Sequence, residues 1–122
     1  MATADCPFCH LGDRVLAENR LSVAVRDREP AAEGHTLVIP KRHCTSFFDL
    51  EPAEVEACYE LVRRERAALR TALAPDGFNV GVNDGPSAGQ GVEHACLHLI
   101  PRYAGDHPDV RGGVRHVIPT RR

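Results

Sequence analysis

The sequence predicts an α+β domain built on a mainly antiparallel, five-stranded sheet. Three observations point to this fold class. One long segment, 52–74, carries apolar residues at helical spacing, and five short segments have the composition of strands. The gaps between neighbouring strand segments are of hairpin length, which favours antiparallel pairing. Because 122 residues suit one compact domain, we expect a single domain over residues 1–122.

The five strand candidates are short apolar segments bounded by turn residues or proline. They are 15–17, 21–25, 35–39, 78–82 and 93–100. Pro40 and Pro101 are expected to end the third and fifth strands, and the fourth leads into a glycine-rich loop at 83–91.

The long helix is expected from Pro52 to about Ala74. Its apolar residues fall near one face and its charged residues take much of the other. A proline in the first turn suits the start of a helix, and the Pro and Gly that follow the segment end it. Cys58 lies on the apolar face, where a free thiol packs like a small hydrophobe. Residues 46–50 are predicted to form a second, short helix.

Charge and hydropathy argue against several protein classes. Fifteen basic and seventeen acidic residues leave a formal charge of −2, whereas a duplex-binding protein needs a clear basic excess. Nucleic acid is therefore not an expected partner. No segment approaches the ~20 apolar residues of a membrane span, and the N-terminus lacks a secretory signal pattern. The odd number of cysteines, five, then predicts the reducing cytoplasm.

The segment with the most chemical information is 93–100, which places His94, Cys96 and His98 at alternate positions. Alternate side chains of a strand share a face, so all three are expected on the open face, with the intervening apolar residues packed against the helix. The glycine-rich loop at 83–91 would let backbone N–H groups approach a phosphate. The alternative is that two imidazoles and a thiol merely occupy a half-exposed strand.

This segment resembles the defining motif of the histidine triad (HIT) family, His-φ-His-φ-His-φ-φ, where φ is apolar. Residues 94–100 match it, with Cys96 in place of the middle histidine. Residues 34–43 resemble a second family motif, 83–90 its phosphate-side loop, and 101–106 the segment after the triad in dinucleoside-hydrolysing members. The resemblance implies a five-stranded antiparallel sheet with one long and one short helix, joined to a second copy in a homodimer.

The resemblance also implies a site for a purine nucleotide, AMP-like or GMP-like, or for its conjugate. Asp27 matches the carboxylate that holds the ribose hydroxyls. The full set of implied nucleotide-binding residues is Asp27, Asn83, Gly89, Gln90, Gly91, His98 and Arg102. In catalytic members the middle histidine attacks the α-phosphorus, and the third histidine, here His98, assists the leaving group.

Cys96 occupies the nucleophile position, so Cys96 and His98 are the predicted catalytic pair. A thiolate is a competent nucleophile, and a thiol pKa falls beside cationic groups, a field that His98 and Arg102 would supply. However, a thiol is shorter than an imidazole, and Gly91 stands where many relatives carry a hydroxyl. Three functions stay open: a nucleotidyl hydrolase or transferase acting through Cys96 on phosphoramidates or dinucleoside polyphosphates, a catalytically impaired nucleotide-binding or regulatory module, and a changed reaction.

The N-terminal segment 1–10 contains a C-x-x-C pair, Cys6 and Cys9. A thioredoxin-like redox site would need a βαβ pattern, which is absent, whereas zinc takes four S or N ligands. One branch of the HIT family binds zinc with such a pair, and the resemblance implies structural Zn²⁺ on four residues. They are Cys6, Cys9, His43 and His94. The alternative is two free thiols and two surface imidazoles; a zinc-stapled interaction protein with a vestigial pocket is the remaining function hypothesis.

The other histidines carry weaker signals. His35, His107 and His116 are interpreted as ordinary polar residues, although His35 and His116 have positions from which they could line a pocket. The tail 103–122 is rich in Gly, Pro and Arg. We expect it to wrap the surface or to reach a partner subunit.

Overall fold

The computed structural model describes residues 3–119 and contains a five-stranded sheet with one long helix. The strands are β1 (Ala17–Glu18), β2 (Ser22–Arg26), β3 (Thr36–Pro40), β4 (Gly77–Gly81) and β5 (Leu97–Arg102). The helix is α1 (Pro52–Leu73), and the 3-10 turns are η1 (Pro7–Cys9), η2 (Gly12–Arg14), η3 (Phe47–Asp49), η4 (Pro86–Ala88) and η5 (Gly113–Val117). The order β1-β2-β3-β5-β4 is antiparallel throughout, which confirms the predicted fold class.

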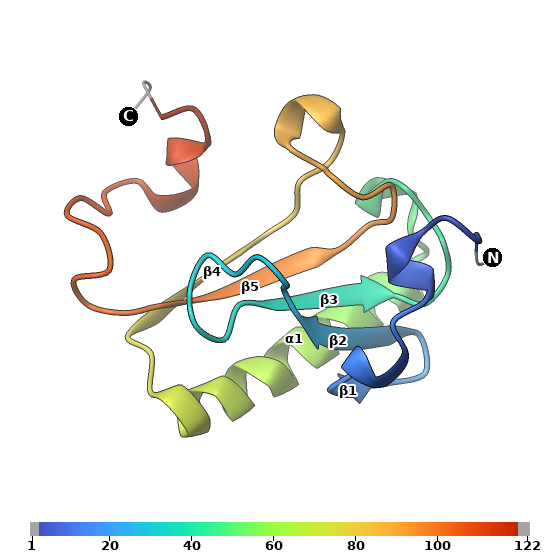
Figure 1. Cartoon of the computed structure of the whole chain (residues 1–122), viewed down its shortest axis with the longest axis horizontal. Coiled ribbons are helices and arrows are strands. Elements are labelled where there is room, and N and C mark those ends of the chain that lie inside the picture. Colours follow the sequence, from blue (N-terminus) through green and yellow to red (C-terminus); the bar gives the residue numbers. More distant parts are fainter. Residues whose placement is uncertain (1–2, 120–122) are drawn as a thin grey trace.

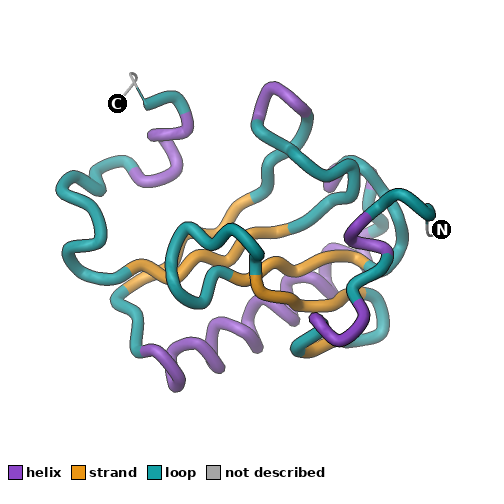
Figure 2. The backbone as a smooth tube through the Cα atoms, viewed as in Figure 1, coloured by secondary structure: helices purple, strands orange, loops and turns teal. Residues whose placement is uncertain are grey.

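The two faces of the sheet are covered by different parts of the chain. Figure 1 shows α1 on one face and the N-terminal segment on the other, and Figure 2 shows that loops gather on the face away from α1. The helix-side core contains Ala24, Val38, Leu99, Cys58, Leu61, Val62 and Leu69. The opposite cluster contains Val23, Val25, Leu37 and Ile39 with Leu11 and Phe8. Alternation along β2 and β3 supplies both clusters, and the prediction that Cys58 is a core residue is confirmed.

The start of β5 differs from the prediction. The strand begins at Leu97, so His94 and Cys96 precede the ladder. The backbone of this stretch pairs elsewhere, since the Ala95 N–H donates to the Cys44 carbonyl at 2.7 Å. Residues 93–96 therefore form an irregular connection that a strand pattern alone did not predict.

The end of β5 also differs, because Pro101 does not stop the strand. Beyond Leu99, β5 pairs with β4 alone. The Arg102 carbonyl accepts from the Asp76 N–H at 2.8 Å on the β4 side. Neighbouring residues of a strand direct their backbone N–H and C=O groups to opposite sides. Since Arg102 pairs on the β4 side, the Pro101 nitrogen points to the unpaired side, and no ladder hydrogen bond is lost there.

The tail after β5 turns back toward the sheet, as Figure 1 shows, and η5 contacts β4. Residues 120–122 of the predicted tail, and residues 1 and 2 of the predicted zinc segment, lie outside the described residues. Within residues 3–119, no helix has both the length and the apolar composition needed to cross a membrane.

The N-terminus of α1 is fixed by a capping box, in which Glu51 and Glu54 exchange hydrogen bonds with each other's backbone. Glu54 is also buried against a cation, because its carboxylate accepts from the Arg42 guanidinium at 2.8 and 3.0 Å. These hydrogen bonds hold the pKa of the Glu54 carboxyl below its usual range. The pair ties the chain after β3 to the start of α1.

We expect Arg42→Ala to lower the urea midpoint of unfolding near neutral pH. Because the folded pKa of Glu54 is depressed, the pair stabilises the protein above the ordinary Glu pKa, and this is lost as pH falls through the lowered value. The difference between variant and wild type should therefore shrink on acidification. Arg64→Ala is the control, since the Arg64–Glu60 ion pair is exposed, at 3.7 Å. An equal effect of both variants would contradict this account.

Candidate functional site

A pocket of about 320 Å³ opens on the face of the sheet opposite α1. Its walls come from the N-terminal segment, the end of β2, β3 and the 83–91 loop. Six of the predicted nucleotide-binding residues line it: Asp27, Asn83, Gly89, Gln90, Gly91 and His98. Cys96 and His94 line it too, so the structure brings the three triad positions to one pocket.

The triad positions nevertheless have different roles in the packing. Cys96 packs against the apolar cluster on this face, and β3–β5 pairing sets His98 opposite Leu37. His94 is only 1 % exposed, and it donates from Nε2 to the Pro40 carbonyl at 2.8 Å. All three positions thus line the pocket, but the ring of His94 is hydrogen-bonded to the fold.

A chain of hydrogen bonds sets the proton on His98. The Ala31 N–H donates to Nδ1 of His35 at 3.0 Å, so the neutral His35 ring carries its proton on Nε2. That Nε2 donates to Nδ1 of His98 at 3.0 Å and lies 3.4 Å from the Asp27 carboxylate. His98 then carries its own proton on Nε2, the atom 3.9 Å from the Cys96 sulfur. His98 can donate a proton at that atom but not accept one.

Burial controls the ionisation of these groups. It lowers the pKa of His35 and of His98, although the Asp27 charge opposes it in both, so both rings are neutral near pH 7. Burial, together with the charge of Asp27, raises the pKa of the Cys96 thiol to about 11. The prediction that His98 and Arg102 lower this pKa is therefore wrong for the free protein.

Arg102 is the one predicted nucleotide residue that does not line the pocket. It lies at the far end of β5, where its guanidinium donates to Asn79 at 2.7 Å and to both Asp106 carboxylate oxygens at 2.7 and 2.8 Å. The same guanidinium lowers the pKa of Asp106 to about 2. Arg102 closes the turn after β5 and is too far along the strand to act on Cys96.

The glycine-rich loop is closed by its own hydrogen bonds, because the N–H groups of Gly85, Gly89 and Gln90 donate within the loop. Gly85 and Gly89 have φ of 94° and 91°, values that favour glycine. Gln90 braces the loop, because its side chain accepts from the Gly85 N–H at 2.8 Å and donates to the Thr45 carbonyl at 2.7 Å. Within residues 3–119, the Gly91 N–H donates to no other residue. It remains open for an anionic ligand.

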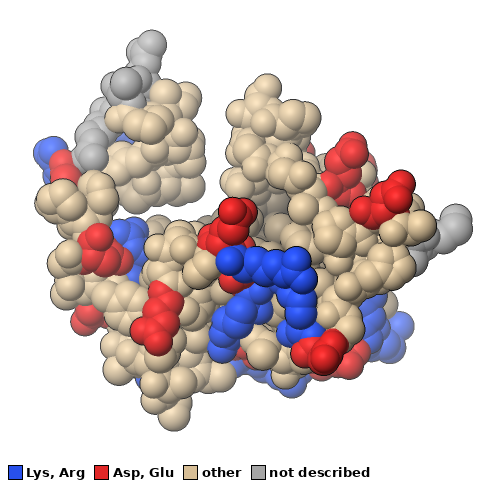
Figure 3. Space-filling model, in the orientation of Figure 1, with Lys and Arg blue, Asp and Glu red and all other residues tan. Residues whose placement is uncertain are grey.

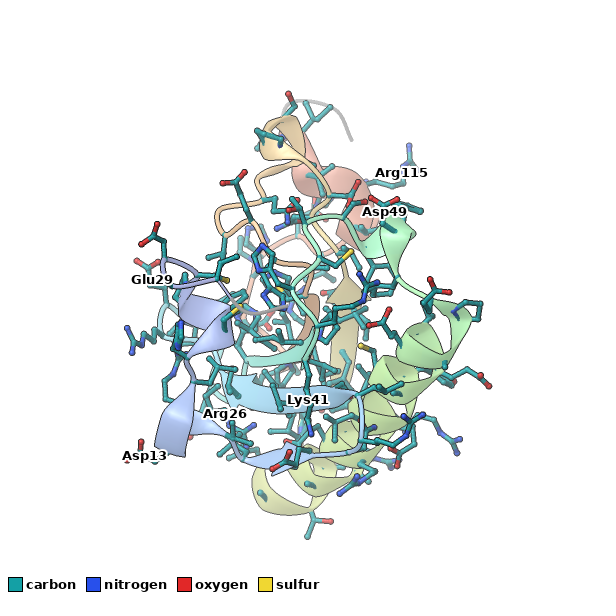
Figure 4. The ribbon with its side chains drawn as sticks, turned by 90° about the vertical axis from the view of Figure 1, so that its right-hand side faces the viewer. Asp13, Arg26, Glu29, Lys41, Asp49 and Arg115 are labelled. Atoms are coloured by element: carbon teal, nitrogen blue, oxygen red, sulfur yellow. The ribbon has the colours of Figure 1, made fainter. Side chains whose placement is uncertain are left out.

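A second cluster lies where the N-terminal segment meets the chain after β3, on the side of the molecule that faces the viewer in Figure 4. Ligand atoms of Cys6, Cys9, His43 and His94 all lie within 4.8 Å of one another. Separations are 3.4 Å for Cys6–His94, 3.5 Å for Cys9–His43 and 3.2 Å for His43–His94. A zinc tetrahedron with S and N ligands has edges of about 3.3–3.8 Å. The four predicted ligands therefore have a separation that fits zinc.

This cluster differs from a similar one in the hydrogen bonds that its histidine ring nitrogens make. His94 donates from Nε2 to Pro40, which leaves the Nδ1 lone pair free for a metal. Asp27, His35 and His98 also bring ligand atoms within 4.8 Å. There, however, the Ala31 N–H occupies the Nδ1 lone pair of His35, so Nε2 holds a proton in place of a metal. The first cluster suits a metal, and the second is a hydrogen-bonded relay.

The comparisons with known proteins decide the family. Residues 10–105 match the HIT domain. The chain belongs to the HIT family. This HIT protein is 37 % identical over 106 residues to a HIT-like protein of Mycoplasma genitalium, covering 83 % of this chain and 75 % of the other.

Two further relatives come from Schizosaccharomyces pombe. One is an adenosine 5′-monophosphoramidase, 36 % identical, with 80 % of this chain and 74 % of the relative covered. The other is an asymmetrical bis(5′-nucleosyl)-tetraphosphatase, 34 % identical, with 79 % of this chain and 53 % of the relative covered. A Zn-bound histidine triad protein from Mycobacterium smegmatis has the same fold, with a TM-score of 0.77, 36 % identity, and coverage of 86 % of this chain and 84 % of that one.

Sequence reasoning missed several residues of the site. The sequence predicts an ordinary polar role or a pocket-lining position for His35, but not its bond to His98, which depends on β3 lying beside β5. Leu37 could have been found from the same strand pairing. Phe8 and Arg14 carry no signal in the sequence that points to this pocket, although both line it. His116 lines a separate pocket.

Proposed function

We propose that this HIT protein binds a purine nucleotide 5′-conjugate in the Cys96 pocket and cleaves it at the α-phosphate. The proposal rests on one juxtaposition: the Cys96 sulfur lies 3.9 Å from Nε2 of His98, the nitrogen that carries the proton. The free Gly91 N–H and the Asp27 carboxylate line the same pocket. A ribose on Asp27 and a phosphate at Gly91 would bring the phosphorus to a nucleophile and a proton donor. Two relatives named for nucleotide cleavage support the reaction class.

In the proposed reaction, an S–P bond forms on Cys96 while the bond from phosphorus to the leaving group breaks. The leaving atom takes the Nε2 proton of His98 as the thiol proton reaches Nε2 through a phosphoryl oxygen, so the His98 ring stays neutral and the thiol proton ends, in effect, on the leaving group. Water then attacks the phosphorus, its hydroxyl stays on the released nucleotide, and its proton returns to the sulfur of Cys96. His35 keeps His98 in the donor tautomer throughout.

The second candidate is a nucleotide-binding module with little turnover. One observation favours it: within residues 3–119 the only hydrogen-bond contact of the Cys96 thiol is with a ring nitrogen that already carries a proton. Among the described residues, no side-chain base is hydrogen-bonded to the thiol to remove its proton. The pocket would then bind a nucleotide without attacking it.

Cys96→Ala separates the two candidates. With adenosine 5′-phosphoramidate as substrate, we expect kcat to fall at least roughly 100-fold while AMP affinity, measured by calorimetry, stays close to wild type. An adduct on Cys96 should appear in the intact mass of the wild-type protein. If the wild type is inactive and Cys96→His creates activity, the binding-module candidate is correct and the covalent proposal is not.

We also propose that Cys6, Cys9, His43 and His94 hold a structural Zn²⁺. The fit of the donor atoms to a tetrahedron supports this, as does the Pro40 carbonyl that orients His94. When bound, the ion would join the N-terminal segment to the chain after β3 and to the residues before β5, and it would supply folding free energy rather than reaction chemistry.

Loss of one ligand tests the zinc proposal. We expect Cys6→Ser to abolish stoichiometric zinc in metal analysis and to lower the melting temperature by roughly 10 °C. Cys44→Ser is the matched control, since the Cys44 thiol donates to the Ser46 carbonyl and belongs to no metal cluster among the described residues. Wild-type protein without zinc, or a control that loses as much, would rule the site out.

The family resemblance also leads us to propose a homodimer. β4 is an edge strand of the sheet, and its outer edge has no strand partner within residues 3–119, so a second copy could extend the sheet there. The expected cytoplasmic location and the expected absence of nucleic acid and membrane partners stay predictions from composition.

A further inference from the structure

We propose that Arg14 contacts the base of the bound nucleotide, and that the Cys96 pocket prefers guanine to adenine because of this contact. The inference rests on the proposed function, which places a purine nucleotide in that pocket. It names the base, which the ribose and phosphate contacts of the proposed site do not determine.

Arg14 lies at the end of the pocket away from the reacting groups. It is the last residue of η2, and its Nη2 donates to the Arg26 carbonyl at 3.2 Å. That carbonyl is on the β1 side of β2, because the Ala24 carbonyl, two residues earlier on the strand, accepts from the Leu16 N–H. His98 is on β5, and β3 lies between β2 and β5. At least two strand spacings, about 10 Å, therefore separate the Arg14 end of the pocket from β5.

A nucleotide bound as proposed would span this distance, with its base toward Arg14. Asp27, the proposed ribose ligand, directly follows β2, so a ribose there and a phosphate beside Cys96 leave the β2 end of the pocket for the base. Phe8 and Leu37 line the pocket and pack in the same apolar cluster. They offer apolar contacts to the faces of the ring, and Arg14 offers hydrogen-bond donors to its edge.

Arg14 is a half-buried cation without a carboxylate partner. Within residues 3–119, its guanidinium makes one hydrogen bond, to the Arg26 carbonyl, and no ion pair. In contrast, Arg26, Arg42 and Arg102, whose side chains are also partly covered, each pair with a carboxylate. A guanidinium has five N–H donors, so most of the Arg14 donors are available to a ligand. A ligand with acceptors would replace the hydration that burial removes from this group.

The other charges at this end of the pocket favour a neutral group over a further phosphate. Arg28 also lines the pocket, but it is exposed, and two acidic pocket residues, Asp27 and Glu29, flank it in the chain. Figure 3 shows basic side chains gathered over the end of β2 and the turn after it, with acidic side chains beside them. A second phosphate on the ribose would bring more negative charge to these carboxylates. A neutral base with a polar edge has no such cost.

The edge of guanine matches a guanidinium, whereas the edge of adenine does not. Guanine has two adjacent acceptors, N7 and O6, which together accept two hydrogen bonds from one arginine. Adenine has the N6 amino donor in place of O6, so two donors would face each other there. Arg14 therefore discriminates both by attraction to guanine and by an unsatisfied contact with adenine.

Calorimetry with GMP, AMP and 7-deaza-GMP tests the proposal. The wild type should bind GMP at least roughly tenfold more tightly than AMP, and 7-deaza-GMP, which lacks the N7 acceptor, should lose most of that advantage. Arg14→Lys keeps the charge and removes the planar fork. It should bring the GMP and AMP dissociation constants to within about threefold of each other, with AMP affinity close to wild type. Arg20→Lys is the control and should keep the wild-type ratio, because this exposed arginine lies in the turn between β1 and β2 and does not line the pocket.

Failure of this inference is distinct from failure of the proposed function. Equal binding of GMP and AMP by the wild type, or tighter binding of AMP, overturns the guanine preference alone. A ratio that Arg14→Lys leaves unchanged overturns the role of Arg14, and so does an equal loss of both nucleotides, because Arg14 would then contact the ribose or phosphate that they share. The 7-deaza-GMP comparison needs only the wild type, so equal affinity for GMP and 7-deaza-GMP overturns the contact even if the variant does not fold. Absence of binding of any of the three nucleotides overturns the nucleotide site itself.

Discussion

The hydrogen bond from His94 Nε2 to the Pro40 carbonyl, 2.8 Å long, is the interaction on which the rest of the site depends. It holds a buried imidazole with its other nitrogen toward the N-terminal thiols. The stretch that carries this ring, 93–96, lies outside the strand ladder, and β5 begins at Leu97. The N-terminal segment lies over the open face of the sheet, where Phe8 is a wall of the Cys96 pocket.

One short motif therefore serves two purposes. Its first histidine belongs to a cluster of two thiols and two imidazoles with the spacing of a zinc site. Its second and third positions, Cys96 and His98, face the pocket. The replacement of a histidine by Cys96 changes the chemistry at the centre of the motif and leaves its architecture intact, because both neighbours are held by other bonds. His35 holds His98, and Pro40 holds His94.

The spacing of apolar residues, and the prolines and glycines between segments, predicted most of the fold. The helix from Pro52 was predictable because its apolar face and its end signals are local, and the strand candidates fell within a few residues of the observed ones. The sequence did not predict that His94 lies outside β5, because its hydrogen bond is to the Pro40 carbonyl of another strand. The position of Arg102 was misjudged for a related reason. Arg102 is close to the triad in the sequence, but Asn79 and Asp106 hold its side chain at the other end of β5.

The division of the triad can be measured directly by ¹⁵N NMR of the histidine rings, with AMP and zinc added in turn. His94 and His98 should both show a proton on Nε2. AMP should shift the His98 ring and the Gly91 amide and leave His94 unchanged, whereas zinc should shift Nδ1 of His94 and leave His98 unchanged. A proton on Nδ1 of His98, or AMP shifts at His94 with none at His98, would contradict the account.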